Sequence, residues 1–449
     1  MGPSPMMGNF SSAERRCFWA IVLFALVVRL GAAWYWQDQV QRSGESFRFG
    51  DSHSYWIIAS NLARGEPYQF GSENSKIFRS PLYPILLAPW TWIGPGNPSS
   101  WGVWMARLMG CFLGCGAVAC IMWMTRNVAS PTVALIAGIL ASIYPGAIAM
   151  SIFILSEAIA TPMFTLSCAC VLWGLREPSR GRSALIAAGV AFGLSCLARP
   201  SWSLWPLVLF SFVLLATPTR NPREMLSTIR LLTFFCLAAV LVMVPWWIRN
   251  YRITGKFVPT TLQVGASLYD GWHPGASGAS DENMEFVVPF LAAQQKEDEM
   301  LANRGLPLES TLEWRIDQRL QRAAREWAWK NPSDVIWLSL VKLGKTWSPL
   351  PVAKEVRPLV RWSEAFGYTA LVVGGLVGAW RLRREPGGWL AWMPCLYLGL
   401  LHAVFIGSVR YRQPGVLLLC PLAAAGWLCI HEWIRKRGSQ SVHRQTDSS

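Results

Sequence analysis

The chain consists of long apolar runs joined by short charged connectors and interrupted by two long polar segments. Most runs approach the roughly 20 residues that a helix needs to cross the hydrocarbon of a bilayer, and none alternates as a barrel strand does. The pattern therefore predicts an all-α polytopic membrane protein. About ten transmembrane helices are expected, near residues 17–36, 101–124, 131–149, 152–175, 184–198, 202–217, 227–248, 364–381, 388–407 and 414–434.

The two long polar segments cover about residues 37–100 and 249–363, and each follows an odd-numbered span. Both are therefore expected on one face of the membrane, opposite the two termini. Short helices are predicted within these segments at Asp51–Leu62, Pro81–Trp92 and Ser310–Trp329, the last of them stopped by Pro332.

Residues 335–347 are apolar on one side but carry Lys342 and Lys345 near the middle. A lysine at the centre of a bilayer costs about 2.5–3.5 kcal/mol even on the lenient insertion scale. This stretch is therefore expected to lie at the membrane interface rather than to cross it.

Composition agrees with a membrane protein, since 52% of the 449 residues are hydrophobic, 15% are charged and the mean hydropathy is +0.29. Many of the 26 tryptophans lie at the ends of apolar runs, where indole rings meet lipid headgroups. One membrane-embedded domain is expected over residues 1–434, followed by a cytoplasmic tail at 435–449. The first run carries Arg29 and lacks a small-residue cleavage pattern, so it is expected to remain as an anchor.

The formal net charge of +15 is distributed in a way that argues against a nucleic-acid partner. Basic residues recur in alternate connectors, such as Arg15-Arg16 and 381–384, which the positive-inside rule places in the cytoplasm. The predicted location is the plasma (inner) membrane, with the long polar segments on the outer or periplasmic face. All eleven cysteines lie within or beside apolar runs, so no disulfide framework is expected.

Two polar clusters follow the first span, GDSHSY at residues 50–55 and FRSPLYP at residues 78–84. A carboxylate and a guanidinium at the mouth of a helical bundle suit base catalysis beside an anionic leaving group. Asp51 is therefore the predicted catalytic residue. A helix N-cap is its alternative role, because a carboxylate at that position satisfies free backbone amides.

Several other residues are predicted to bind substrate. Four arginines fall at the outer ends of spans, namely Arg79, Arg199, Arg410 and Arg412. An anionic partner such as a phosphate is proposed for them. The alternative is that their side chains snorkel to lipid headgroups. Glu157, at the start of a span, is predicted to orient donor or acceptor, and its alternative role is placement at a helix N-terminus.

His53, two residues after Asp51, is a further candidate for phosphate contact, with a structural role as the alternative. No metal-ligand spacing stands out, so no metal ion or other cofactor is predicted. The glycine-rich stretch at 269–278 is either a flap that closes over the site or an ordinary surface loop.

The order of these motifs resembles the GT-C superfamily of glycosyltransferases, in the branch that holds protein O-mannosyltransferases and lipid A aminoarabinose transferases. The matching stretches are Asp51 with Tyr55, Asn61-Leu62 and Gly65, the block at 79–84, Ala198-Arg199-Pro200, 247–251 with 255–258, and 410–414. The chain departs from many relatives at Ser52, where they have Glu, and at Arg79, where they have Lys.

The resemblance implies a bundle of ten or more spans, a polyprenyl-phosphate sugar as donor and Asp51 as the catalytic carboxylate. It also implies substrate contacts by Arg79 and Tyr83 in the second cluster, and some relatives bind a divalent ion near the carboxylate.

The predicted function is that of an inverting membrane glycosyltransferase whose acceptor is a lipid, a protein or a glycan. A polyprenyl phosphate leaves as an anion, so it needs guanidinium donors more than a general acid. A single carboxylate on the face opposite the leaving group implies inversion. The alternatives are a transporter or lipid flippase, although the chain shows no repeated halves, and a structural scaffold of an envelope assembly.

Overall fold

The computed structural model of the chain describes residues 11–446 apart from 73, 94–99, 217–221, 282–283 and 352–356, and the described part contains helices and no strands. The helices are α1 (Ser12–Arg42), α2 (Gly50–Ala63), α3 (Leu82–Thr91), α4 (Ser100–Arg126), α5 (Pro131–Ile143), α6 (Pro145–Ile152), α7 (Glu157–Arg176), α8 (Gly181–Ala198), α9 (Trp205–Ala216), α10 (Pro222–Thr254), α11 (Val264–Gly271), α12 (Val287–Asn303), α13 (Leu312–Lys330), α14 (Pro332–Trp347), α15 (Pro358–Arg381), α16 (Pro386–Val404), α17 (Val409–Leu417) and α18 (Cys420–Thr446). Two 3-10 turns, η1 (Pro178–Arg180) and η2 (Pro200–Trp202), join α7 to α8 and α8 to α9.

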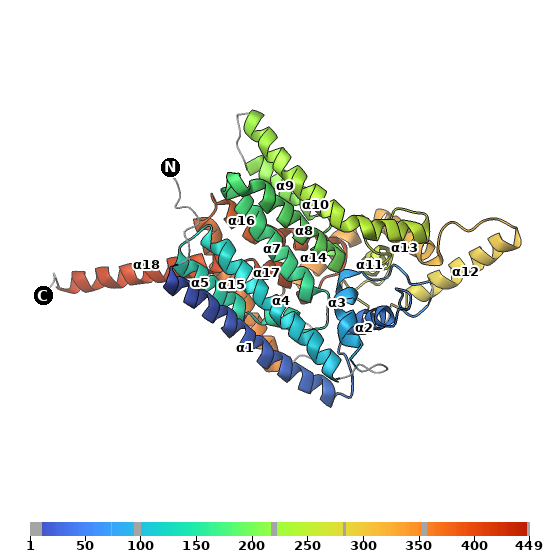
Figure 1. Ribbon diagram of the computed structural model, residues 1–449, viewed down its shortest axis with the longest axis horizontal. Coiled ribbons are helices and arrows are strands. Elements are labelled where there is room, and N and C mark those ends of the chain that lie inside the picture. The colour runs from blue at the N-terminus through green and yellow to red at the C-terminus, as the bar shows by residue number, and fades with distance from the viewer. Residues whose placement is uncertain are drawn as a thin grey trace.

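The long helices form a bundle with the short helices at one end (Figure 1). Helices α7, α8 and α10 pack in sequence, α1 lies against α4 and α5, and α15 packs along α18. Helices α2, α3, α11 and α13 gather at the end from which α12 projects, and both termini lie toward the opposite end. We call the end with the short helices the loop end. The two long polar segments therefore meet at one end of the bundle, as predicted.

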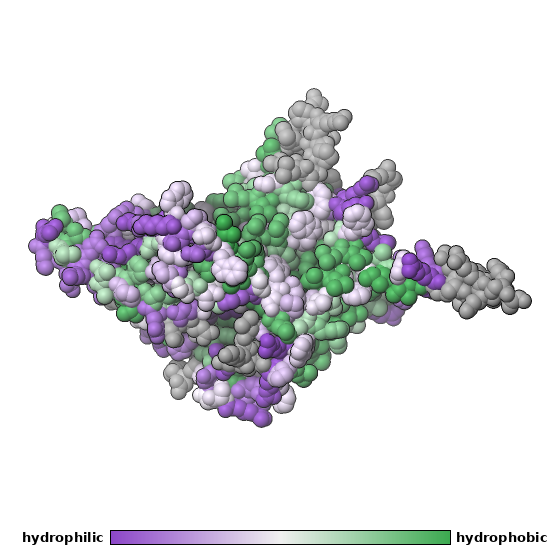
Figure 2. All heavy atoms as spheres, turned by 180° about the vertical axis from the view of Figure 1, so that it is seen from behind, coloured by the Kyte–Doolittle hydropathy of each residue, from purple (hydrophilic) through white to green (hydrophobic). Residues whose placement is uncertain are grey.

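Six helices are long and apolar enough to cross a membrane, namely α1, α4, α7, α8, α10 and α16. Two bent pairs, α5–α6 and α17–α18, raise the number to eight if each pair is one span. The chain is thus a multi-pass membrane protein with an all-helical fold. Hydrophobic side chains cover much of the middle of the molecule, and hydrophilic ones gather toward the loop end (Figure 2).

Two of the ten predicted spans are not among the helices that are both long and apolar enough to cross a membrane. Helix α9 has 12 residues, a length of about 18 Å against a hydrocarbon core of about 30 Å. Helix α15 is long enough, but it is not among the apolar spans, and its first half carries Arg361 and Glu364. The end of the predicted span at 217 and the first part of the connector, to residue 221, lie outside the described residues.

The predicted short helices are confirmed as α2, α3 and α13, and α13 ends at Lys330, two residues before Pro332. Helix α14 is turned with its polar side inward. Lys342 is completely buried and its Nζ donates to the Val404 carbonyl at 2.8 Å, whereas Ile336, Trp337 and Leu340 are exposed. This orientation suits a helix whose outer side meets lipid, and the 16 residues of α14 are fewer than a span needs.

Aromatic stacking fixes three of the segments that reach the loop end. The Trp202 ring of η2 stacks on Phe164 of α7 at a centroid distance of 3.5 Å and on Tyr397 of α16 at 5.6 Å. All three side chains are buried. The start of α7, the α8–η2 junction and the end of α16 are therefore held in fixed relation to one another.

Helices α15 and α18 approach closely because glycines line their contact. A Cβ atom on Gly378 would overlap the Leu422 carbonyl, and one on Gly426 would overlap the Gly374 carbonyl. Small residues allow this kind of close helix packing within membranes. The seam holds α18, and with it the short helix α17, against the bundle.

We therefore expect Gly378→Leu to destabilise the protein by at least about 1–3 kcal/mol, because the side chain forces two backbones apart. The measurement is thermal unfolding in detergent, followed by loss of the monodisperse peak in gel filtration. The matched control is Gly116→Leu, a helical glycine of α4 with no atom near its Cβ position. Equal melting temperatures for the two variants would contradict a close-packed seam.

Candidate active site

Asp51 lies in the first turn of α2, but it does not cap the helix. The N-cap position is Phe49, and no side chain there bonds a backbone amide. Instead the Asp51 carboxylate accepts from two arginines that are distant in sequence. Arg79 Nη2 donates to Oδ1 at 2.6 Å and Arg410 Nη1 donates to Oδ2 at 2.9 Å. The alternative N-cap role is therefore wrong.

Glu157 joins the same set of charges from the start of α7. Arg410 donates to it through Nε at 2.5 Å and Nη2 at 3.1 Å, a bidentate pairing. Arg199, at the end of α8, reaches Glu157 Oε1 at 3.0 Å. The five side chains form a continuous series, Arg79, Asp51, Arg410, Glu157 and Arg199, which we call the arginine–carboxylate chain.

The two carboxylates differ in their access to solvent. The Asp51 side chain is 33% exposed, whereas that of Glu157 is 1% exposed. A substrate can therefore reach Asp51 directly. Glu157 pairs with Arg410 and Arg199 and has almost no contact with solvent of its own.

Its three guanidiniums and two carboxylates give the arginine–carboxylate chain a net charge of +1. Burial alone would raise the pKa of Asp51, but the charges of Arg79 and Arg410 outweigh it and hold the pKa below its ordinary value. Asp51 is therefore ionised at neutral pH. In this arrangement it is also a weak base, because a general base works best with a pKa near the ambient pH.

Helix geometry explains why Arg79 sits where it does. Ser54 follows Asp51 by three residues and Tyr55 by four, so they share its face of α2. Arg79 Nε donates to Ser54 Oγ at 2.9 Å, and the guanidinium lies 5.0 Å from the Tyr55 ring centroid. From the second polar segment, Gln263 Oε1 accepts from Arg79 Nη1 at 3.1 Å.

Three predicted site residues lie elsewhere. Tyr83 is buried against Tyr55, edge to face at 5.2 Å, so it supports the ring beside Arg79 and does not reach the arginine–carboxylate chain. His53 is exposed. Since two residues turn a helix by about 200°, His53 faces away from Asp51.

Arg412 is two residues from Arg410 and faces away from it for the same reason. It is completely buried, donates to the Ser348 carbonyl at 2.5 Å and pairs with Glu364 at 3.3 Å. Its guanidinium also lies over Tyr368, 3.6 Å from the ring centroid. The contacts of Arg412 join α17 to α14 and α15, and the structure gives no support to phosphate binding by this residue.

Tyr411 is a site residue that the sequence did not single out. Its ring centroid lies 5.1 Å from Arg199 Cζ and 5.8 Å from Arg410 Cζ. Its position between the two arginines of the stretch 410–412 could have indicated this residue from the sequence. Gln263 had no such signal, because nothing in the sequence links it to Arg79.

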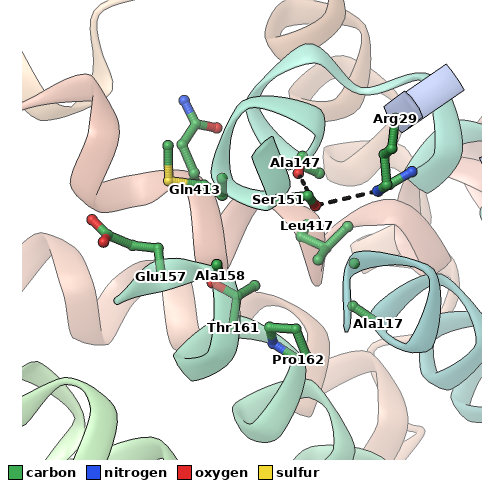
Figure 3. Close-up of a pocket in the computed structure, with 12 residues that line it drawn as sticks. Arg29, Ala117, Ala147, Ser151, Glu157, Ala158, Thr161, Pro162, Gln413 and Leu417 are labelled. Carbon is green, nitrogen blue, oxygen red and sulfur yellow. Dashed lines mark hydrogen bonds between the residues drawn. The ribbon is translucent and has the colours of Figure 1, made fainter. Parts of the chain in front are cut away.

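A small cavity lies behind Glu157 in the bundle. Its volume of about 10 Å³ is close to that of one water molecule. Figure 3 shows Glu157 and Arg29 at opposite ends of the lining, with Ser151 Oγ accepting from Arg29 Nε at 3.2 Å. The buried hydroxyl of Thr161 lines the same space and has no hydrogen-bond partner among the residues that the structure describes.

The two long polar segments hold each other near Arg79. The Glu313 carboxylate of α13 accepts from the backbone amides of Lys76 at 2.9 Å and Ile77 at 3.0 Å. Arg249 donates to the carbonyls of Tyr68 and Lys76 at 3.1 and 3.0 Å. These contacts fix the stretch of chain that leads into Arg79.

The predicted flap stretch at 269–278 contacts the segment ahead of Arg410. The Gly278 carbonyl accepts from the Gly407 amide at 2.9 Å, and Lys345 Nζ donates to the Ser277 carbonyl at 2.8 Å. Gly278 has a φ of +77°, which favours glycine. The stretch is thus tied to the loop that positions Arg410, and whether it moves over the site stays a prediction.

The charges around Asp51 do not fit a divalent cation. Both carboxylate oxygens already accept from guanidiniums, and a cation there would be repelled by Arg79 and Arg410. In the part of the chain that the structure describes, no three His, Cys, Asp or Glu side chains are grouped to hold a metal ion.

The structure is thus a helical membrane bundle with a net-positive site of three arginines and two carboxylates at one end. Residues 87–258, which include Glu157 and Arg199, match the family model of dolichyl-phosphate-mannose-protein mannosyltransferases. No curated protein sequence matches the chain.

Two solved structures of an archaeal oligosaccharyltransferase share the fold. The archaeal oligosaccharyltransferase AglB from Archaeoglobus fulgidus, in complex with an inhibitory peptide and a dolichol-phosphate, is 12% identical over 96% of this chain with a TM-score of 0.58. Its apo form is 13% identical over 98% of the chain, also with a TM-score of 0.58. The chain spans about half, 52%, of the length of these two structures. ArnT from Cupriavidus metallidurans, bound to undecaprenyl phosphate, is 14% identical over 93% of this chain and 77% of its own, with a TM-score of 0.41.

The family model and the oligosaccharyltransferase fold confirm the predicted resemblance to the GT-C superfamily. Neither comparison supports the transporter alternative.

The contact of Glu313 with the first polar segment generates a pH prediction. Burial raises the pKa of Glu313 to about 7, although the Ile77 and Lys76 amides oppose the shift. Since the pKa is higher in the folded protein than in the unfolded chain, the stability contributed by this group falls as the pH rises from about 4.5 to about 7. Glu313→Gln keeps a neutral acceptor for both amides, so its melting temperature should match wild type near pH 4.5 and exceed it at pH 8.

The matched control is Glu309→Gln, at an exposed pair with Lys256, which should show no such pH-dependent difference. If Glu313→Gln melts below wild type at pH 8, the buried carboxylate is favoured in its charged form and the assignment is wrong.

Proposed function

We propose that this protein is an inverting glycosyltransferase that moves a sugar from a polyprenyl-phosphate donor to a hydroxyl or amino group of an acceptor. The acceptor is a lipid, a protein or a glycan. The reaction takes place at the loop end, on the outer face of the plasma (inner) membrane. The observation that carries the proposal is the arginine–carboxylate chain, because it places one accessible carboxylate beside three guanidiniums.

The arginines suit the donor phosphate. Arg79, Arg199 and Arg410 present guanidinium donors at one site, and charge-assisted bonds from guanidinium to phosphate are short and strong. A phosphodiester carries one negative charge, which balances the +1 of the arginine–carboxylate chain. When the sugar leaves, a second negative charge develops on the phosphate, and the same fixed guanidiniums stabilise it.

Donor binding would change the character of Asp51. Its low pKa depends on the charges of Arg79 and Arg410. A phosphate that binds these guanidiniums offsets their positive charge and thereby raises the pKa of the carboxylate. Asp51 then becomes a stronger base. The acceptor oxygen or nitrogen forms a bond to the anomeric carbon, the bond from that carbon to the phosphate oxygen breaks, and the acceptor proton passes to Asp51.

Glu157 is a positioning residue in this scheme. It is 1% exposed and holds Arg410 through two hydrogen bonds, so it keeps that guanidinium in place when Asp51 releases it. Without Glu157, Arg410 and Arg199 would be buried charges with no acidic partner at their inner side, an arrangement that is costly in a medium of low dielectric constant.

The comparisons support the donor class. The family model is named for transferases that use dolichyl phosphate mannose, and the similar archaeal oligosaccharyltransferase was solved with a bound dolichol-phosphate. The placement on the outer face rests on the basic connectors at the opposite end of the chain's spans.

Asp51→Asn should lower turnover by at least about 100-fold, because loss of a general base typically costs 10²–10⁴ in rate. The measurement is release of free undecaprenyl phosphate from a panel of undecaprenyl-phosphate sugars by purified protein in detergent. Binding of undecaprenyl phosphate itself, measured by isothermal titration, should persist because the arginines remain.

The control is Asp38→Asn, which removes a carboxylate that pairs with Arg42 on α1, away from the site. It should turn over donor at the wild-type rate. Equal turnover by wild type and Asp51→Asn would remove Asp51 from its catalytic role, and failure of wild type with every donor would overturn the proposed function.

A further inference from the structure

His402 is a buried histidine beside the arginine–carboxylate chain that the reaction scheme does not use. It lies in the last turn of α16 and is 6% exposed. Its ring stacks on Tyr411 at a centroid distance of 4.5 Å with an angle of 10° between the planes. Tyr411 is the residue whose ring faces the guanidiniums of Arg199 and Arg410. One aromatic ring therefore separates His402 from the arginines.

The hydrogen bonds of His402 define its tautomer. Nδ1 lies 2.9 Å from the Ile406 carbonyl oxygen, and a carbonyl can only accept, so Nδ1 carries the proton. In the neutral ring Nε2 is then an acceptor with a free lone pair.

Nε2 of His402 is buried and has no hydrogen-bond partner among the described residues. A buried acceptor without a donor is unfavourable, and such atoms are uncommon in folded proteins. The oxygens of Asp51 and Glu157, in contrast, already accept from guanidiniums. Nε2 is therefore an unused acceptor next to a site whose other groups are donors or are already paired.

The two halves of a polyprenyl-phosphate sugar need different partners. The phosphate offers only acceptors and is served by the arginines, whereas the hydroxyl and amino groups of the sugar are donors and need an acceptor. We propose that Nε2 of His402 accepts a hydrogen bond from a hydroxyl or amino group of the transferred sugar, which makes His402 a sugar-recognition residue. This inference rests on the proposed function, since it takes the donor to be a sugar linked to a polyprenyl phosphate.

The test separates the sugar from the phosphate. His402→Phe keeps an aromatic ring stacked on Tyr411 but removes Nε2, and His402→Gln places an amide oxygen at similar reach. For the undecaprenyl-phosphate sugar that wild type turns over, His402→Phe should raise KM about five- to tenfold, the usual effect of one lost hydrogen bond, with a smaller change in kcat. His402→Gln should restore part of the loss.

Binding of sugar-free undecaprenyl phosphate is the internal control, and it should be the same within about twofold in wild type and both variants. His431→Phe, at an exposed histidine of α18, controls for the substitution itself and should leave both measurements unchanged. An unchanged KM in His402→Phe overturns the proposal. An equal loss of binding for undecaprenyl phosphate overturns it as well, because the residue would then act on the phosphate site or on folding.

The proposed function fails in a different way. If wild type turns over no donor in the panel, the enzyme assignment falls and the role of His402 falls with it. If wild type turns over a donor and His402→Phe does so with the same KM, only the role of His402 is lost.

Discussion

The structure depends on the need to neutralise three guanidiniums that lie mostly shielded from solvent at the loop end of a membrane bundle. Charges that leave water must be paired and hydrogen-bonded, or they destabilise the fold. Asp51 and Glu157 meet this requirement from two separate elements, one in the first polar segment and one at the start of a span. The ion pairs therefore join α2, α7, α8 and α17 at the same point at which the proposed chemistry takes place.

Breaks in the helices allow these elements to meet. Pro145 follows the break between α5 and α6, and the pair bends by 57°. The bend of 67° between α17 and α18 sets residues 409–417 at an angle to α18. Arg410, near the start of α17, pairs with both Asp51 and Glu157. Arg412, Gln413 and Glu364 then form a second buried polar group that holds α17 against α15.

The sequence predicted the membrane bundle, the two polar segments and the short helices, because each depends on local apolar pattern and proline position. It also singled out Asp51, Arg79, Glu157, Arg199 and Arg410, which the structure brings together, although their roles stay predictions. Arg412 and His53 were included because residue type and proximity in sequence do not reveal the face of a helix. Tyr411, Gln263 and His402 were missed because their importance comes from contacts across the chain.

The same carboxylate has two consecutive tasks in the proposed cycle, and this sets an order of events. While Arg79 and Arg410 pair with Asp51, the carboxylate is a counter-ion and a poor base. It becomes a useful base only after a phosphate has engaged these arginines. An acceptor that arrives first meets a carboxylate that will not take its proton, whereas one that arrives after the donor meets an activated base. In the proposed cycle, the pairing of Asp51 with Arg79 and Arg410 thus protects the site from futile deprotonation and makes acceptor activation follow donor binding.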